Sequence, residues 1–344
     1  MAAREFLIGC NGRGCQQSSI EHPVSLVEPS IEEQFRMVKE SGAFDYFDRL
    51  PQPEQMAEYQ RCIVKYGLPV HTCSWFYMLG KEEPLIERNL RLCAEVGAKC
   101  HNVMTFTRHA DGHVLTDQEI ADSYSWIWER GAMLGVEPSF ELHVNMWTED
   151  PRRVEPVARL VRARGLPFNF TLDYSHINFK IENPEEQDIS GIREDVAAGR
   201  VVLDPFQAGN LGDLWLDMGI VRWVQLRAVA PNGPKNLWAK NDQGEYGRGI
   251  QYPFIQPKPG EFHSPWYAYK LEPSKQAIRN ALRYHLTHPD SPLRYMTTEM
   301  INLVDYGLGA KYSLFEQNVA CARWIRATWA QMKSMHAAGI PLTV

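Results

Sequence analysis

The regular alternation of short β-rich runs with helical patterns is the feature that most limits how this chain can fold. Strands separated by helices pair in parallel rather than as hairpins, and the helices then cover the sheet. Several helical stretches are followed by a glycine of the kind that ends a helix before the next strand. These glycines are Gly42, Gly67, Gly97, Gly135 and Gly165.

The number of strands favours a closed barrel. Eight strands are expected, at residues 5–10, 43–47, 69–74, 100–105, 137–143, 168–173, 221–227 and 294–299. Helices are expected at residues 31–41, 53–66, 84–96, 117–134, 151–163, 189–198 and 274–285, with a final amphipathic helix at 313–335 that closes the barrel. An open doubly wound sheet is the alternative, but no GxGxxG motif follows the first strand. We therefore predict a (β/α)₈ TIM barrel, with residues 1–344 as one domain.

Residues 228–272 break this rhythm. They are rich in proline, glycine and aromatic residues and lack a clean helical or strand period. A long irregular stretch inside a compact domain is usually an active-site loop or a partner-binding surface, and a packed structural excursion is the alternative. We expect this insertion near the active-site face of the barrel.

Composition excludes several classes of protein. The net charge is −6 and no basic tract is present, so a nucleic-acid partner is not expected. No apolar stretch approaches the roughly 20 residues that span a bilayer, and residues 1–9 lead into a strand without a signal peptide. The seven cysteines include no CxxC pair, which indicates reduced thiols in a cytoplasmic protein rather than a cysteine-based zinc site.

The parity of the expected strands directs acidic and polar side chains into the barrel. Alternate residues of a barrel strand point inward, and in residues 140–144 Glu141 and His143 share the parity opposite to their apolar neighbours. Near the ends of three later strands, the inward positions are held by Asp173, by Gln225 and Arg227, and by Glu299. The carboxyl ends of barrel strands are where barrel enzymes build their sites.

Three converging carboxylates need compensation. A buried carboxylate without a partner is costly, so Glu141, Asp173 and Glu299 either share a cation or pair separately with arginine or lysine. The matching parity in three strands favours the cation. Oxygen ligands suit a hard divalent ion, and Mn²⁺ is the first expectation, with Mg²⁺ or a similar ion as the alternative. His71, His101, His109 and His113 show no spacing that suggests a second metal.

These residues carry a family resemblance. Their order resembles that of the xylose isomerase-like barrels, which include sugar isomerases, ketose 3-epimerases and metal-dependent apurinic endonucleases. The matching series is Glu141, then Asp173-Tyr174-Ser175-His176, then Gln225-Leu226-Arg227, then Glu299. The resemblance implies that Glu141, Asp173 and Glu299 are metal ligands and that His176 contacts the substrate.

The fourth ligand departs from the family pattern. The family's usual histidine on the third of these strands is Gln225 in this sequence. An amide oxygen can still bind a hard ion, and strand register favours Gln225. His263, in the insertion, is the rival for this position.

His143 is a second departure. It lies two residues after a metal ligand on the same strand, so it should lie beside the ion, where its neutral form is favoured and can act as a base near pH 7. A structural histidine is the alternative. The Glu-x-His strand, Gln225, the length and the aromatic-rich insertion together resemble the larger subunit of bacterial C-glycoside deglycosidases.

That finer resemblance implies a carbon–carbon lyase. In a 3-oxo-C-glycoside the metal would polarise the 3-keto oxygen, His143 would remove the proton at C2, and the enolate would expel the aryl carbon at C1. Arg227 and His176 would hold sugar oxygens or the developing negative charge. A small β-sandwich partner subunit, docked at residues 228–272 in a hetero-oligomer, is also implied.

Other functions remain open. A metal-dependent isomerase or ketose 3-epimerase would use Glu141 and Glu299 as its proton-transfer pair. An apurinic-site endonuclease is disfavoured by the charge of −6 and by the missing histidine ligands. A non-catalytic sugar-binding or partner-stabilising subunit is the fourth hypothesis.

Overall fold

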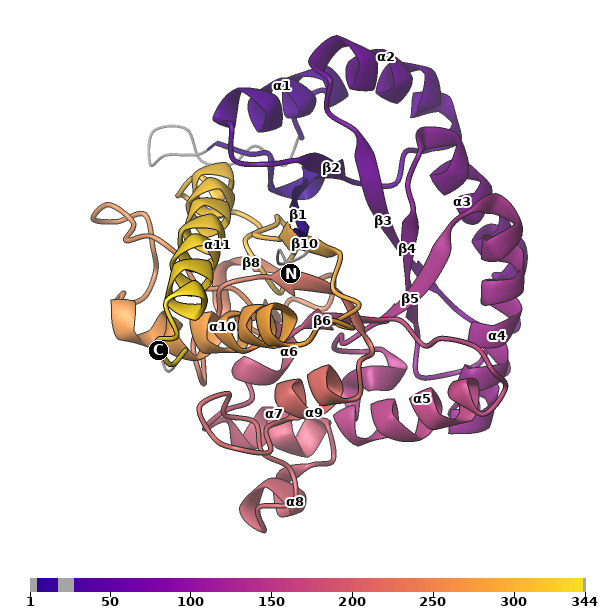
Figure 1. The fold of residues 1–344 in the computed structure, drawn as a ribbon. Coiled ribbons are helices and arrows are strands. Elements are labelled where there is room, and N and C mark those ends of the chain that lie inside the picture. The colour runs from indigo at the N-terminus through magenta and orange to yellow at the C-terminus, as the bar shows by residue number, and fades with distance from the viewer. Residues whose placement is uncertain (1–4, 18–27, 343–344) are drawn as a thin grey trace.

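In the computed structural model, which describes residues 5–17 and 28–342, eight parallel strands close into a barrel inside a ring of helices (Figure 1). The order around the barrel is β1-β10-β7-β6-β5-β4-β3-β2, so β10 closes the barrel against β1. The fold is the predicted (β/α)₈ barrel, and residues 1–4 of the N-terminal prediction lie outside the described residues. The strands are β1 (Leu7–Asn11), β2 (Tyr46–Asp48), β3 (Val70–Tyr77), β4 (Cys100–Thr105), β5 (Glu137–Glu141), β6 (Phe170–Asp173), β7 (Val221–Leu226) and β10 (Tyr295–Thr298).

The outer ring follows the predicted helices with one correction. The 189–198 helix is wrong, because Gly191 has a φ of 66° and separates two short helices. Four of the predicted glycines are left-handed C-caps, whereas Gly165 lies beyond Ala163, the C-cap of its helix. The α-helices are α1 (Ile31–Ser41), α2 (Met56–Tyr66), α3 (Glu83–Val96), α4 (Asp117–Leu134), α5 (Val154–Arg162), α6 (Ser175–Asn178), α7 (Pro184–Ile189), α8 (Arg193–Ala197), α9 (Leu211–Asp217), α10 (Glu272–Thr287) and α11 (Leu314–Ala337).

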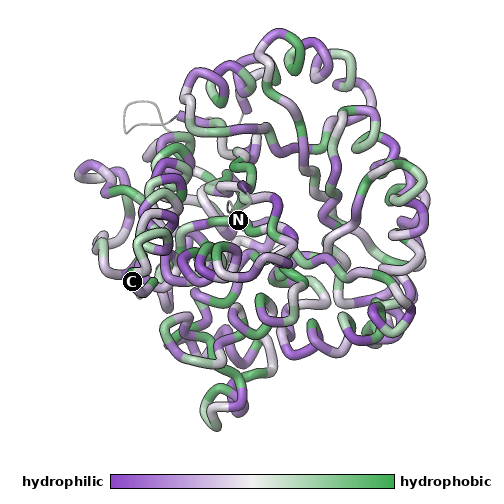
Figure 2. The backbone as a smooth tube through the Cα atoms, viewed as in Figure 1, coloured by the Kyte–Doolittle hydropathy of each residue, from purple (hydrophilic) through white to green (hydrophobic). Residues whose placement is uncertain are grey.

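Hydrophobic packing surrounds the barrel and also closes its floor. Hydrophobic and hydrophilic residues alternate along the outer helices (Figure 2), so each helix can bury one face against the strands. Inside the barrel, at the N-terminal ends of the strands, Tyr46, Cys100, Trp223 and Tyr295 form a buried cluster. Gly9 is required there, because a Cβ at this position would lie 2.2 Å from the ring of Tyr46.

The insertion at residues 228–272 is largely irregular, as predicted. It contains a short antiparallel pair, β8 (Asn236–Lys240) and β9 (Tyr246–Gly247). Ile250 and Tyr252 are buried, whereas Tyr246 and Tyr269 are exposed. The insertion is therefore packed against the barrel on one side and presents aromatic side chains on the other.

All seven cysteines are buried and none forms a disulfide. Among the helices of residues 5–17 and 28–342, none combines the length and the apolar character needed to cross a membrane.

Candidate metal centre

Three carboxylates meet above the barrel floor. Glu141 ends β5, Asp173 ends β6 and Glu299 follows β10 directly, so all three stand at the carboxyl ends of their strands. One carboxylate oxygen of each lies within 4.8 Å of the others, and none of the three residues is more than 6% exposed. The side chains that strand parity directed inward therefore come together.

Arg227 neutralises part of this charge. Its guanidinium lies 2.8 Å from Asp173 Oδ2 and 2.6 Å from Glu299 Oε2. Glu141 instead accepts a hydrogen bond from the Asn102 side chain. Burial, with the nearby Glu299 and Asp173 carboxylates, raises the pKa of Glu141 well above its usual range. Pairing with arginine was the alternative to a shared cation. Arg227 pairs with Asp173 and Glu299, but Glu141 has no such ion pair in the described part of the chain.

The remaining donor set fits a divalent cation. Three carboxylates facing one guanidinium leave an excess of negative charge in a buried space, which a cation would offset. Gln225 pairs in register with Asp173, and its Nε2 donates to Glu299 Oε1 at 3.2 Å. Its Oε1 is buried without a hydrogen-bond partner among the described residues. Glu141, Asp173, Glu299 and Gln225 would hold the ion.

His263, the rival of Gln225, lies elsewhere. Its Nδ1 is 2.9 Å from Ser264 Oγ, and its Nε2 accepts from the backbone N–H of Leu237 at 3.4 Å. Its ring packs against Trp238 and Phe262. These contacts keep His263 within the insertion, whereas Gln225 lies beside the carboxylates, and its role as the fourth ligand stays a prediction.

His143 is held as a neutral imidazole beside the carboxylates. Its Nδ1 is 2.6 Å from the carbonyl of Val144, which only accepts hydrogen bonds, so Nδ1 carries the proton. The unprotonated Nε2 then accepts from the Tyr306 hydroxyl at 3.1 Å. Burial, followed by the nearby His176, lowers the pKa of His143 well below its usual value. Its ring centroid is 4.3 Å from that of His176.

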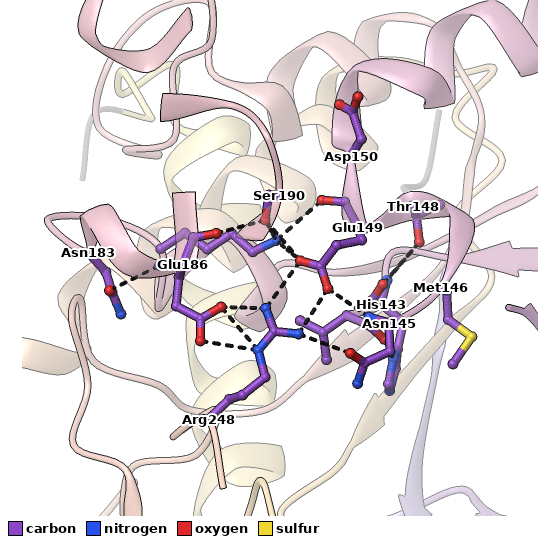
Figure 3. Close-up of polar contacts among 12 residues, drawn as sticks. His143, Asn145, Met146, Thr148, Glu149, Asp150, Asn183, Glu186, Ser190 and Arg248 are labelled. Atoms are coloured by element: carbon purple, nitrogen blue, oxygen red, sulfur yellow. Dashed lines mark hydrogen bonds and ion pairs between the residues drawn. The ribbon is translucent and has the colours of Figure 1, made fainter. Parts of the chain in front are cut away.

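The loop that carries His143 (residues 142–150, the His143 loop) is fixed by its own side chains. Thr148 Oγ1 donates to the carbonyl of Glu141 at 2.7 Å and accepts from the N–H of His143 at 3.0 Å. Asn145 has a φ of 65°, and its N–H donates to Glu149 Oε2 at 2.7 Å. Figure 3 shows the contacts of Thr148 with His143 and of Asn145 with Glu149. Asparagine is one of the few non-glycine residues that adopt this left-handed conformation readily, and the surrounding bonds hold the turn.

A buried ionic cluster connects the His143 loop to the insertion (Figure 3). We call it the Glu149 cluster; its members are Glu149, Lys180, Glu186, Ser190 and Arg248. Glu149 lies 2.6 Å from Lys180 Nζ and 2.9 Å from an Arg248 guanidinium nitrogen. Arg248, which belongs to the insertion, also pairs with Glu186 from α7. Three segments far apart in the sequence are therefore joined here.

The two residues predicted to bind substrate lie in different places. Arg227 lines the cavity, with its guanidinium 4.0 Å from the ring centre of Tyr306. His176 lies underneath, where its Nε2 is 3.3 Å from Asp173 Oδ2 and 3.3 Å from Arg227. It is fully buried and does not line the cavity, its Nδ1 has no hydrogen-bond partner within residues 5–17 and 28–342, and one of its ring nitrogens lies within 4.8 Å of ligand atoms of Glu141 and His143.

A cavity of about 310 Å³ opens above the carboxylates. Glu141, His143, Arg227 and Glu299 line its inner end. The other lining residues are Asn11, Arg13, Asp48, Arg49, Leu50, Gln52, Gln55, Ser74, Trp75, Phe76, Met104, Ile301, Leu303 and Tyr306. The cavity thus combines acidic groups, guanidinium groups and aromatic rings, a lining suited to a small polar ring.

Sequence reasoning missed Asp48, Asn102 and Tyr306. Asp48 ends β2 with the inward parity of Tyr46, and its Oδ1 accepts from Thr72 at 2.7 Å. Parity could have found Asp48 and Asn102, which both lie on strands. Tyr306 belongs to the loop after β10, where no period predicts the direction of a side chain.

Comparisons with known proteins establish the fold but no family. A scan against models of known protein families finds no match, and a search of curated proteins finds none either.

Solved structures do resemble the chain. The E. coli 3-keto-D-glucoside 4-epimerase YcjR, in its apo form, matches with a TM-score of 0.52 at 16% identity, over 94% of this chain and all of that one. An L-ribulose 3-epimerase matches with a TM-score of 0.54 at 10% identity, over 99% of this chain and all of that one. The IOLI protein, solved with a zinc atom, matches with a TM-score of 0.51 at 10% identity, over 95% of this chain and 99% of that one. Barrels of this kind therefore include sugar epimerases and a zinc-bound protein.

Proposed function

We propose that this protein is a metal-dependent sugar epimerase or isomerase that moves a proton at a carbon next to a carbonyl group. The observation that carries the proposal is the placement of Glu141 and Glu299. Both line the inner end of the cavity, and they come from β5 and the end of β10, which β6 and β7 separate in the barrel. Two carboxylates that reach one space from different strands can remove a proton from one face of a sugar carbon and return one to the other.

The remaining residues fit this chemistry. A divalent cation held by Glu141, Asp173, Glu299 and Gln225 would act as a Lewis acid that stabilises the charge developing on a sugar carbonyl, by several kcal/mol. Arg227 lines the cavity, and with its other N–H groups on Asp173, Ser175 and Glu299 one N–H of Nη2 is left to donate to a sugar oxygen.

The substrate in this proposal is a ketose or a 3-keto sugar. Phe76 lines the cavity with its ring 5.7 Å from that of His143, and this ring can stack on a sugar ring. The fold shared with a 3-keto-glucoside epimerase and a ketose 3-epimerase supports this substrate class.

A second candidate is the C-glycoside lyase, and one observation favours it. The Val144 carbonyl holds the proton on His143 Nδ1, so Nε2 has a lone pair, which accepts from the Tyr306 hydroxyl in the structure and becomes free for the substrate when that hydroxyl turns away. In this reaction Nε2 takes the C2 proton of a 3-oxo-C-glycoside, the C–H electrons form the C1–C2 double bond, and the bond from C1 to the aryl carbon breaks. The aryl carbon leaves with that electron pair and is protonated. A small partner subunit at residues 228–272 belongs to this proposal.

The test is incubation of the Mn²⁺-loaded protein in D₂O with simple ketoses and with 3-oxo-C-glycosides, followed by NMR. An epimerase exchanges deuterium into the position next to the carbonyl and forms the epimer, and Glu299→Gln abolishes both. His143→Ala keeps most of this turnover. Release of free aglycone that His143→Ala abolishes, while the metal stays bound, would favour the lyase. No deuterium exchange with either class of substrate, from protein that binds no metal, would favour a non-catalytic sugar-binding subunit.

A further inference from the structure

A hairpin on the rim of the barrel brings together two histidines and an aspartate. Residues 106–115, which we call the His109 hairpin, follow β4 and are closed by an antiparallel bridge between Arg108 and Val114. The N–H of His109 also donates to the carbonyl of His113 at 3.0 Å across a tight turn. Two histidines four residues apart in sequence therefore face each other.

Their donor atoms converge on Asp111. His109 Nδ1 lies 3.0 Å from Asp111 Oδ2, and His113 Nδ1 lies 2.6 Å from Asp111 Oδ1. One ligand atom from each of the three residues lies within 4.8 Å of the others. These are hydrogen-bond distances, shorter than the roughly 3.3 Å between ligands about 2 Å from a tetrahedral ion, so an ion would replace the shared protons and move the ligand atoms slightly apart.

The orientation of His109 is fixed by its surroundings. Its Nε2 packs over the backbone of Gly80, where a Cβ would come within 2.1 Å of it. Its Nδ1 accepts from the N–H of Asp111 at 3.3 Å, so a lone pair of this nitrogen faces the hairpin. A lone pair that also lies 3.0 Å from a carboxylate oxygen is repelled unless a proton or a cation lies between them.

His113 stands between two carboxylates. Its Nε2 is 2.9 Å from Glu119 Oε1, while its Nδ1 faces Asp111. Glu119 is held in place by the capping box of α4, in which it bonds to Thr116. The negative charge of Asp111 and Glu119 can be balanced by a protonated His113 or by a metal ion bound at its Nδ1.

We propose that His109, Asp111 and His113 form a second metal site, separate from the carboxylates of the barrel. Two imidazoles and one carboxylate suit a transition metal such as Zn²⁺, with water in the remaining position. The side chains of the three residues are between 30% and 61% exposed, so an ion reaches them without opening the fold. The spacing of these histidines gave no such signal in the sequence, because only the closed hairpin brings them together.

The position of the site suggests what a bound ion would do. The hairpin begins at Phe106, whose ring stacks on Phe76 with 6.2 Å between centroids. Phe76 lines the active-site cavity and contacts the ring of His143. An ion that clamps the hairpin would therefore stiffen one wall of the cavity. This inference does not depend on the proposed function.

The test is Zn²⁺ binding to the metal-depleted full-length protein, measured by equilibrium dialysis and calorimetry. We expect His113→Ala to bind one ion fewer than the wild type, with an unchanged circular dichroism spectrum. His336→Ala, which replaces an exposed histidine on α11, serves as the matched control and should bind as many ions as the wild type. Glu141→Gln should keep the hairpin ion whatever happens in the barrel.

Two outcomes would overturn the proposal. One is the same Zn²⁺ stoichiometry and affinity in His113→Ala as in the wild type. The other is loss in Glu141→Gln of the ion that His113→Ala also removes, because both variants would then report on one site in the barrel.

Discussion

Thr148 connects the candidate metal centre to the candidate base through one hydroxyl group. It is 1% exposed, donates to the carbonyl of Glu141 and accepts from the N–H of His143. The hydroxyl thereby sets the spacing between a candidate metal ligand and the imidazole two residues later. The sequence alone does not predict that Thr148 bridges the Glu141 carbonyl and the His143 N–H.

Replacing Thr148 with valine keeps the shape of the side chain but removes the hydroxyl. The carbonyl of Glu141 and the N–H of His143 then stay buried without this partner, so we expect a loss of about 1–3 kcal/mol in the free energy of unfolding. Urea denaturation measures the loss. Thr148→Ser keeps the hydroxyl and should lose only about 1 kcal/mol, from one buried methyl group. Equal losses in both variants would contradict the role given to the hydrogen bonds.

Strand parity could predict individual residues only where a strand fixes their direction. Glu141, Asp173 and Glu299 were expected to converge because each ends or directly follows a strand, and they do converge. The short helix α6 turns the ring of His176 toward Asp173 and Arg227, and the expected contact of His176 with the substrate stays a prediction. The ion pairs between Arg227 and the carboxylates join strands far apart in the sequence, and no local pattern encodes them.

At the scale of elements, the Glu149 cluster fastens the insertion to the barrel. Arg248 reaches from the insertion to Glu149 in the His143 loop and to Glu186 on α7. Its backbone N–H also donates to Asp305 Oδ1 at 2.9 Å. The insertion is therefore held by charges that are mostly hidden from solvent.

Arg248→Met should release this attachment. Removing one partner from a largely buried ionic network leaves Glu149 and Glu186 short of a cation, and we expect a loss of about 3 kcal/mol in the free energy of unfolding. Proteolysis within residues 228–272 should become faster. Arg193→Met breaks an exposed pair with Asp188 and provides the control, with a change of less than about 1 kcal/mol. Similar effects in the two variants would argue against the cluster.

The Glu149 cluster also gives stability a dependence on pH. Burial raises the pKa of Glu149, but Lys180 and Arg248 outweigh it, so the folded-state pKa lies below the ordinary value. The unfolded chain then takes up a proton first as the pH falls. The contribution is fully present above glutamate's ordinary pKa of about 4.3 and is lost as the pH falls toward the lowered folded value.

The measurement compares unfolding free energies of the wild type and Glu149→Gln at pH 7 and at pH 3. The wild type should be the more stable protein at pH 7, and the difference should shrink at pH 3. A difference that is constant over this range would show that Glu149 carries no charge-dependent stabilisation.

On the scale of the whole molecule, the eight-stranded barrel could be predicted from the sequence, but the short elements outside it could not. The alternation of strands and helices predicts all eight barrel strands to within a few residues, because each strand must bury its apolar side against a helix. The helices α6 and α9 and the pair β8–β9 were missed. They are short, and their structure depends on packing against the barrel rather than on their own period.

Binding of a divalent ion at the barrel centre should stabilise the entire fold, because its ligands come from strands spread along the sequence. At a free Mn²⁺ concentration ~100 times the dissociation constant, the expected gain is about 2.7 kcal/mol. Thermal unfolding with and without the ion measures it. Glu141→Gln should lose most of the gain, and an equal shift in that variant would place the stabilising ion elsewhere.

The packed floor has a consequence for traffic through the barrel. Tyr46, Trp223 and Tyr295 fill the amino-terminal end of the barrel. A small molecule therefore has to reach the carboxylates, and leave them, through the opening at the carboxyl-terminal end. Phe76 lines the cavity and is 36% exposed, so it can be reached from solvent. A molecule bound over the carboxyl-terminal opening would therefore slow both the entry and the departure of a ligand.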